Sequence, residues 1–238
     1  MGLVGDDHFR VKVSADGATW RQAIDVDPAT GVVDFPSGVG AGSLAGFRNR
    51  VINGAFAINQ RGYASGGALT AGAYAHDRWK AGTSGATYTF TQSSPETTIA
   101  ISTGQLRQII EGAQFEGGAF TLSWSGTAQG RVNGGAFSAS PLTVSGLAAG
   151  VDVTIEFGAG TLGKVQFEPG AYATRFEARP LSLETLLCQR YCQFHVAGVL
   201  GSLQLLATAA VANASVSLGL TYPTSMRATP TSTRRSMR

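Results

Sequence analysis

The side chains of this sequence best suited to binding chemistry are tyrosines in turns rich in glycine and alanine. Tyr63, Tyr74 and Tyr172 each lie in such a turn, where side chains are commonly exposed. An exposed aromatic ring can stack on the C–H face of a sugar while nearby polar groups bind its hydroxyls. We therefore predict these three tyrosines as ligand-binding residues for a saccharide. Tyr88 and Trp124 lie on the apolar side of alternating segments, which predicts core packing instead.

Carboxylates are the second group that could do chemistry. A glycosidase needs two carboxyl groups about 5–9.5 Å apart, one of them with a raised pKa. The candidates are Asp152, Glu156, Glu168 and Glu177, and the first two fall on the polar side of an alternating segment, where a solvated side chain is the default. The sequence contains no Gly-x-Ser-x-Gly elbow and no Gly-x-x-x-x-Gly-Lys-Ser/Thr loop. We therefore predict that the protein is not an enzyme.

A third group consists of Cys188, Cys192 and His195, whose spacing could place them on one face of a helix as a metal site. A fourth ligand is not apparent, and the paired-cysteine spacing typical of zinc sites is missing. A disulfide within a helical turn is also geometrically awkward. We predict two buried, reduced thiols and assign no metal and no cofactor.

Short alternating segments must position these side chains. Apolar and polar residues alternate over residues 87–91, 120–125, 151–157 and 164–168, and glycine-rich turns separate these segments. A period of two places one set of side chains in a core and the other set toward solvent. The pattern predicts an all-β fold, an antiparallel sandwich or barrel over residues 47–180.

A small β unit precedes this region. In residues 1–36, Phe9, Val11 and Val13 alternate with polar residues and predict a half-buried strand. A unit of this size can bury little apolar surface, so we expect that it needs a partner chain or particle. Residues 37–46 are a linker rich in glycine and serine by composition.

Residues 181–238 are predicted to form one short helix, a partial β segment and a flexible basic tail. Ser182 can cap the helix, and one face is formed by Leu183, Leu186, Leu187 and Tyr191. Residues 216–222 alternate like a strand. Four arginines lie in the last twelve residues, so the rest of the chain is nearly neutral despite a net charge of +3. We therefore predict no nucleic-acid partner.

Several segments, taken in order, resemble the tail-fibre and adhesin proteins of bacteriophages and prophages. The resemblance covers roughly residues 50–192 and is carried by residues 51–62 (VINGAFAINQRG), 74–79 (YAHDRW), 164–170 (KVQFEPG), 173–180 (ATRFEARP) and 187–191 (LCQRY). The layout is also similar to jelly-roll carbohydrate-binding modules. Those modules often hold calcium through an acidic residue at the position where this sequence has Ala55, which puts a calcium site in doubt.

The resemblance implies a jelly-roll sandwich with a small N-terminal β unit and one short helix after the sandwich. It implies a virion component, a tail fibre or a head spike, that binds host-cell surface polysaccharide and contacts other virion structural proteins through its N-terminal unit. A homotrimer is expected. We further expect synthesis in the bacterial cytoplasm without a signal peptide, and no membrane insertion, because the apolar stretch 196–212 is interrupted by polar residues and glycines. A purely structural fibre or spike-base connector is the alternative, and a capsule-degrading enzyme is the least supported reading.

Overall fold

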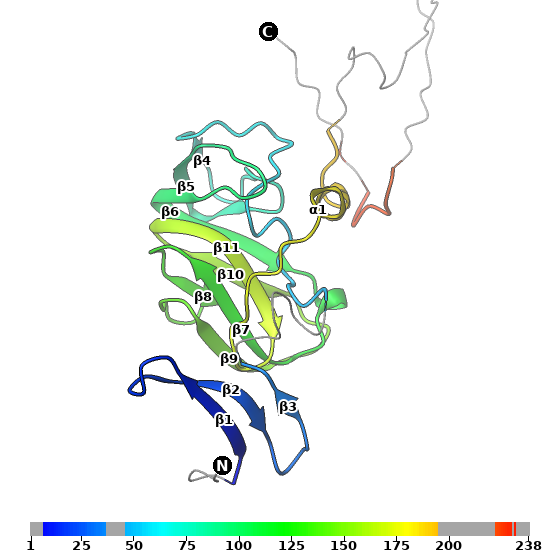
Figure 1. Ribbon diagram of the computed structural model, residues 1–238. Coiled ribbons are helices and arrows are strands. Elements are labelled where there is room, and N and C mark those ends of the chain that lie inside the picture. The colour runs from blue at the N-terminus through cyan, green and yellow to red at the C-terminus, as the bar shows by residue number, and fades with distance from the viewer. Residues whose placement is uncertain (1–6, 37–45, 195–221, 230, 232–238) are drawn as a thin grey trace, which may run out of the picture.

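The computed structural model describes residues 7–36, 46–194, 222–229 and 231. These residues form antiparallel β-sheets, one short α-helix and one 3₁₀ turn, which confirms the predicted all-β class (Figure 1). A small N-terminal sheet lies at one end of the molecule, and a larger sheet with its core forms the remainder (Figure 1). The domain boundaries remain a prediction, because the linker lies almost wholly outside the described residues.

The N-terminal sheet has the order β1-β2-β3. Its strands are β1 (Phe9–Ser14), β2 (Trp20–Val26) and β3 (Val33–Asp34). The β1–β2 turn forms because the carboxylate of Asp16 accepts hydrogen bonds from the backbone amides of Ala18 and Thr19, at 2.9 and 2.7 Å. The predicted half-buried alternation of β1 is wrong: Phe9 and Val13 are exposed. The cause is a bulge between Val11 and Lys12, together with a three-stranded sheet too small to cover its own apolar side.

The larger sheet contains eight strands, ordered β4-β5-β6-β11-β7-β9, with β10 pairing β6 and β8. The strands are β4 (Ala68–Leu69), β5 (Lys80–Phe90), β6 (Ile99–Ile110), β7 (Gly118–Ser125), β8 (Gly130–Val132), β9 (Leu142–Leu147), β10 (Val153–Phe157) and β11 (Gly160–Pro169). The 3₁₀ turn η1 (Gly112–Gln114) precedes β7. Strand β11 pairs with β6 at its start and with β7 along the rest of its length, so it joins two parts of the sheet.

The core lies on the apolar side that the alternation predicts. Phe120, Leu122 and Trp124 of β7 are buried, and Tyr88 of β5 is buried with them. The ring of Trp124 meets Phe157 of β10 edge-on, with centroids 5.1 Å apart. The core placement predicted for Tyr88 and Trp124 is therefore confirmed. Strand β10 is shorter than the alternating segment 151–157, which leaves Val151 exposed before its first residue.

The polar side of β11 is not solvated, contrary to the alternation. Gln166 and Glu168 are fully buried, because the chain before β4 and the chain after β11 cross over them. Arg48 forms an ion pair with Glu168 at 2.7 Å, and the backbone amide of Glu177 donates to Gln166 Oε1 at 2.7 Å. Local periodicity cannot show such covering by distant segments.

Three of the segments named above, residues 51–62, 74–79 and 164–170, contact one another closely. The side-chain amide of Asn53 donates to the backbone carbonyls of Ile58 and Asp77, at 2.8 and 3.0 Å. Trp79 Nε1 donates to the carbonyl of Asn53 at 2.9 Å. A Cβ on Gly54 would lie 2.1 Å from the carbonyl oxygen of Val165, so no larger residue fits here. These contacts hold the chain around Asn53 and Gly54 against the start of β5 and against β11.

Helix α1 (Leu181–Gln189) is the predicted short helix, but its cap and buried face differ from the prediction. Pro180 is the N-cap residue, and Ser182 lies inside the helix. Leu186 is 39% exposed, whereas Cys188 is fully buried against Ile52 and Ile58. The helix lies beside the segment that contains Ile52 and Ile58 (Figure 1). Because the helix packs on this segment, the buried face is the one centred on Cys188.

The C-terminal predictions fall mainly outside the described residues, including most of the strand predicted at 216–222. Tyr222 is described and exposed. Arg227 does not belong to a free tail: its Nε lies 2.7 Å from the Glu111 carboxylate, and its backbone amide donates to the Arg190 carbonyl. Among the described residues, no helix has the length and apolar character needed to cross a membrane.

Candidate functional site

Tyr63 braces the core rather than presenting a free ring. It is half-buried, and its ring lies 4.7 Å from that of Tyr88 and 6.0 Å from that of Phe90. Its hydroxyl donates to the backbone carbonyl of Gly67 at 2.5 Å. Burial raises the pKa of Tyr63. With its hydroxyl engaged and its ring packed, Tyr63 offers little surface to a ligand.

Tyr172 lies at the junction between the two sheets. Its ring is 40% exposed, but its hydroxyl donates to Asp25 Oδ2 of β2 at 3.3 Å. Burial raises the pKa of Tyr172, and the Asp25 carboxylate raises it further. This contact ties the loop after β11 to the N-terminal sheet.

Tyr74 is the predicted residue with an accessible ring and charged neighbours. It is 41% exposed and forms an antiparallel β-bridge with Lys80 at the start of β5. The Arg61 guanidinium lies 4.9 Å from the ring centroid, and the Lys80 ammonium lies 5.7 Å from it. Both distances are within the range of cation–π attraction. The exposed part of the ring can contact a sugar, and the two cations over the ring can attract an anionic group.

The bridge at Tyr74 begins a row of charged residues across the larger sheet. Lys80 pairs with Arg107 of β6, Arg107 pairs with Glu156 of β10, and Glu156 pairs with Arg131 of β8. Directly paired residues project from the same face of a sheet. We call Tyr74, Lys80, Arg107, Glu156 and Arg131 the cross-strand row.

The row lies on the face opposite the core. The next residues along the same strands, Ala81, Leu106 and Phe157, also pair with one another and are all fully buried. Because successive side chains alternate between faces, the row points away from the core. Its cations are only half-buried.

Positive charge exceeds negative charge along the row. The carboxylate of Glu156 accepts a hydrogen bond from Arg131 Nε at 2.7 Å, and Arg107 Nε has no hydrogen-bond partner among the described residues. Partial burial lowers the pKa of Lys80, and the charges of Arg107 and Arg78 lower it further. The far end of the row carries a second aromatic residue, Phe137, 4.4 Å from the Arg131 guanidinium.

Sequence reasoning missed the cations of this row. It recognised a strand at 87–91 but neither the earlier part of β5 nor any of β6. Glycines interrupt the alternation of β5, and Gly104 interrupts that of β6. Strand pairing, rather than spacing along the chain, brings Lys80 opposite Arg107.

The four candidate carboxylates are all engaged by donors within the chain. Besides the ion pairs of Glu156 and Glu168, Glu177 accepts from the amides of Phe47 and Asn49, at 2.6 and 2.8 Å. Asp152 accepts from the amide of Gly112 at 2.8 Å. Each of these contacts joins two segments of the chain that are far apart in sequence, which gives the four residues structural roles.

The cysteines and histidines are placed in separate environments. Cys188 and Cys192 are free thiols, the first buried and the second half-buried, while His195 lies outside the described residues. His76 is buried, with Nδ1 2.7 Å from the Tyr88 hydroxyl and Nε2 3.1 Å from Gln92 Oε1. Among the described residues, no three His, Cys, Asp or Glu side chains are grouped so as to hold a metal ion.

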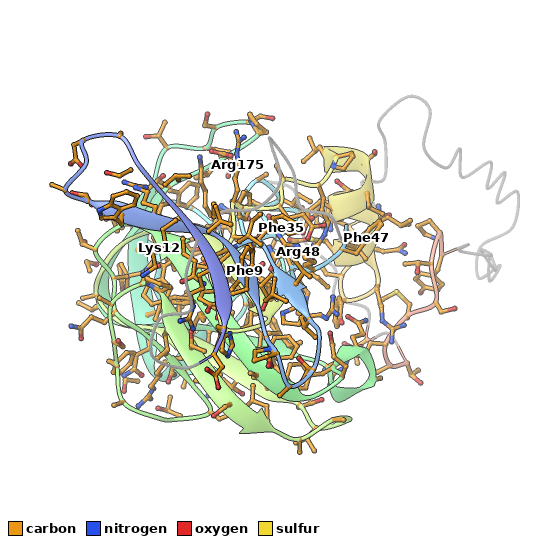
Figure 2. All side chains as sticks on the ribbon, turned by 60° about the horizontal axis from the view of Figure 1, so that its bottom comes forward. Phe9, Lys12, Phe35, Phe47, Arg48 and Arg175 are labelled. Carbon is orange, nitrogen blue, oxygen red and sulfur yellow. The ribbon has the colours of Figure 1, made fainter. Side chains whose placement is uncertain are left out.

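A second candidate surface is the outward face of the N-terminal sheet. Asp25 and Arg10 are paired and lie on the side of Tyr172. The opposite side carries apolar residues from all three strands, namely Phe9, Val11, Val13, Ile24, Val26 and Val33. Val13 is 54% exposed and Val33 is 49% exposed. Figure 2 looks onto this end of the molecule, where Phe9, Lys12 and Phe35 appear in the same view as Phe47, Arg48 and Arg175 of the larger unit.

Comparison of the chain with protein-family models, with curated proteins and with solved structures finds no match.

Proposed function

We propose that this chain is a non-enzymatic adhesion module of a phage-type tail fibre or head spike, and that it binds a host surface polysaccharide. The observation that carries the proposal is the exposed side chain of Tyr74, with the cations of Arg61 and Lys80 held over its ring. An aromatic platform with polar neighbours is the arrangement that stacks on a sugar ring and binds its substituents. The fold within this proposal is a jelly-roll sandwich, in which β11 passes from one sheet to the other.

The arrangement of the two units supports an attachment role for the N-terminal sheet. Strands β4 and β5, which flank Tyr74 in the chain, lie at the end of the molecule away from β1–β3 (Figure 1). One end can therefore engage a particle while the other faces a cell. The outward apolar face fits another structural protein of the particle that presents an apolar surface. Within the proposal the assembly is a homotrimer, which supplies avidity to weak single contacts.

Binding to cells tests the proposal. The full chain should bind encapsulated host cells and should lose binding to capsule-deficient cells. Tyr74→Ala should weaken binding about fivefold to a hundredfold, if the ring contributes about 1–3 kcal/mol, as an aromatic ring does when a nucleic-acid base stacks on it. Tyr222→Ala removes another exposed tyrosine and should leave binding unchanged. Equal binding to both cell types would contradict the proposal.

The structural-connector reading is the second candidate, and specific contacts favour it. Tyr63 and Tyr172 both use their hydroxyls within the chain, so two of the three predicted ligand residues have structural roles already. If this reading holds, the protein binds no host glycan, and Val33→Asp on the outward face abolishes its incorporation into particles.

A further inference from the structure

We propose that the cross-strand row binds an extended anionic polysaccharide, such as a polyuronate, laid across the strands of the larger sheet. This inference rests on the proposed function and specifies the class of glycan. It is carried by the pairing of Lys80 with Arg107 and by the aromatic residues at both ends of the row.

The first argument is the cost of placing two cations opposite each other. Like charges directly opposite in an antiparallel pair destabilise a sheet. Here Lys80 and Arg107 face each other on β5 and β6, and the one carboxylate in the row, Glu156, is hydrogen-bonded to Arg131. An anionic ligand bound across Lys80 and Arg107 would offset the repulsion between the two cations. The relief of this repulsion would favour binding.

The second argument is the geometry of the donors. Arg107 Nε is shielded from solvent and has no hydrogen-bond partner among the described residues. A guanidinium presents a planar fork that matches a carboxylate bidentately. Because Nε itself is closed to solvent, a sugar carboxylate would bind the terminal nitrogens of the Arg107 guanidinium, and the ammonium of Lys80 would bind the same group or its neighbour as a point charge.

The third argument is the length of the row and its aromatic ends. From the Tyr74 segment to β8 there are four strand spacings of about 4.8 Å, or about 19 Å in all. Tyr74 stands at one end beside Lys80, and Phe137 stands at the other end beside Arg131. Two rings separated by a line of polar residues suit a chain of several sugars better than a single sugar.

The position of Glu156 argues for a polysaccharide over a nucleic acid. This carboxylate lies between Arg107 and Arg131 in the row, where it would repel the closely spaced phosphates of a nucleic acid. Glu156 is 6% exposed and is bound by Arg131. A sugar polymer, with uncharged hydroxyls between its carboxylates, is repelled by this carboxylate less than a nucleic acid is. Apart from the arginines near the C-terminus, the chain is also nearly neutral, unlike a typical nucleic-acid surface.

The test is calorimetric titration of the full chain with oligomers of alginate, a polyuronate, and with neutral dextran of the same length. Wild type should bind alginate, with affinity falling as salt rises from about 50 to 200 mM, because the contact is between charges. Arg107→Gln and Lys80→Gln should each weaken alginate binding about ten- to a hundredfold, since a hydrogen bond to a charged group contributes about 1.5–3 kcal/mol. The matched control is Arg175→Gln, which removes an exposed arginine from the loop after β11 and should leave binding unchanged.

Each other outcome overturns the inference in its own way. Dextran binding that depends on Tyr74 but not on Arg107 would refute the anionic class and leave the proposed adhesion intact. Equal losses in Arg107→Gln and Arg175→Gln would show general charge attraction without a site. Tighter binding of single-stranded DNA than of alginate would replace the polysaccharide with a nucleic acid. Absence of binding to any glycan, in titration and to host cells alike, would refute the adhesion proposal as well.

Discussion

Lys80 of β5 and Arg107 of β6 stand directly opposite each other on the face of the larger sheet that points away from the core. Replacing either cation should therefore stabilise the free protein. We expect Lys80→Gln to raise the free energy of unfolding in urea by about 0.2–1 kcal/mol at low salt, and the gain should shrink at high salt. Lys164→Gln, which breaks the pair with Glu96 at 2.9 Å, should give no gain. A loss of stability in Lys80→Gln would show that the cation–π contact with Tyr74 outweighs the repulsion from Arg107.

His76 makes the stability of the fold depend on pH. Its pKa is lowered to about 4, chiefly by burial, whereas an unfolded histidine titrates near 6.5. The unfolded chain therefore binds more protons between these values, so the contribution of His76 is full above about pH 6.5 and declines as pH falls toward 4. Between pH 7 and pH 5, wild type should lose roughly 2 kcal/mol more than His76→Gln in urea unfolding. Parallel losses in the two proteins would mean that His76 is not buried in its neutral form.

The ion pair of Glu168 with Arg48 is a buried pair whose disruption should be costly. Glu168 is fully buried and also accepts from the amide and hydroxyl of Thr174, at 2.8 and 2.7 Å. Glu168→Ala leaves Arg48 without its partner and should lower the free energy of unfolding by about 3–5 kcal/mol. Glu116→Ala breaks the exposed pair with Arg50 and should cost about 0–1 kcal/mol. Chemical denaturation of the two variants compares them, and similar small losses would contradict the burial of Glu168.

The hydrogen bond from Tyr172 to Asp25 should hold the N-terminal sheet against the larger unit. Tyr172→Phe removes this bond, which is 3.3 Å long, and such a bond contributes about 0.5–1.5 kcal/mol. We expect amide hydrogen exchange in β1 and β2 to accelerate by up to about tenfold, while exchange in β6 and β7 stays the same. Tyr74→Phe is the control and should alter neither region. Unchanged exchange in Tyr172→Phe would show that the contact does not order the N-terminal sheet.

Periodicity predicted those features that depend on neighbouring residues in the chain. The alternation of Phe120, Leu122 and Trp124 indicated a strand with a buried apolar side, and the structure confirms it. The leucine-rich segment after Pro180 indicated a helix, and α1 is found there. Both predictions rest on the geometry of single elements, in which side-chain direction follows from the backbone repeat.

Predictions of features that depend on residues distant in sequence were wrong, or the features were not predicted at all. The alternation predicts that Glu168 is solvated. It is buried instead, because Arg48 and Thr174, from other parts of the chain, pack on it. Tyr63 and Tyr172 read as free turn residues, yet each uses its hydroxyl within the chain.

The sequence by itself determined the all-β class, the positions of several strands and the short helix, because each depends on a local repeat. Only the tertiary structure decided which charged and aromatic residues share a surface. Strand register places Tyr74, Lys80, Arg107, Glu156 and Arg131 in one row, although these residues are spread over more than eighty positions of sequence. Register is set by the packing of the whole sheet around its core. It therefore cannot be predicted from any one segment of the sequence.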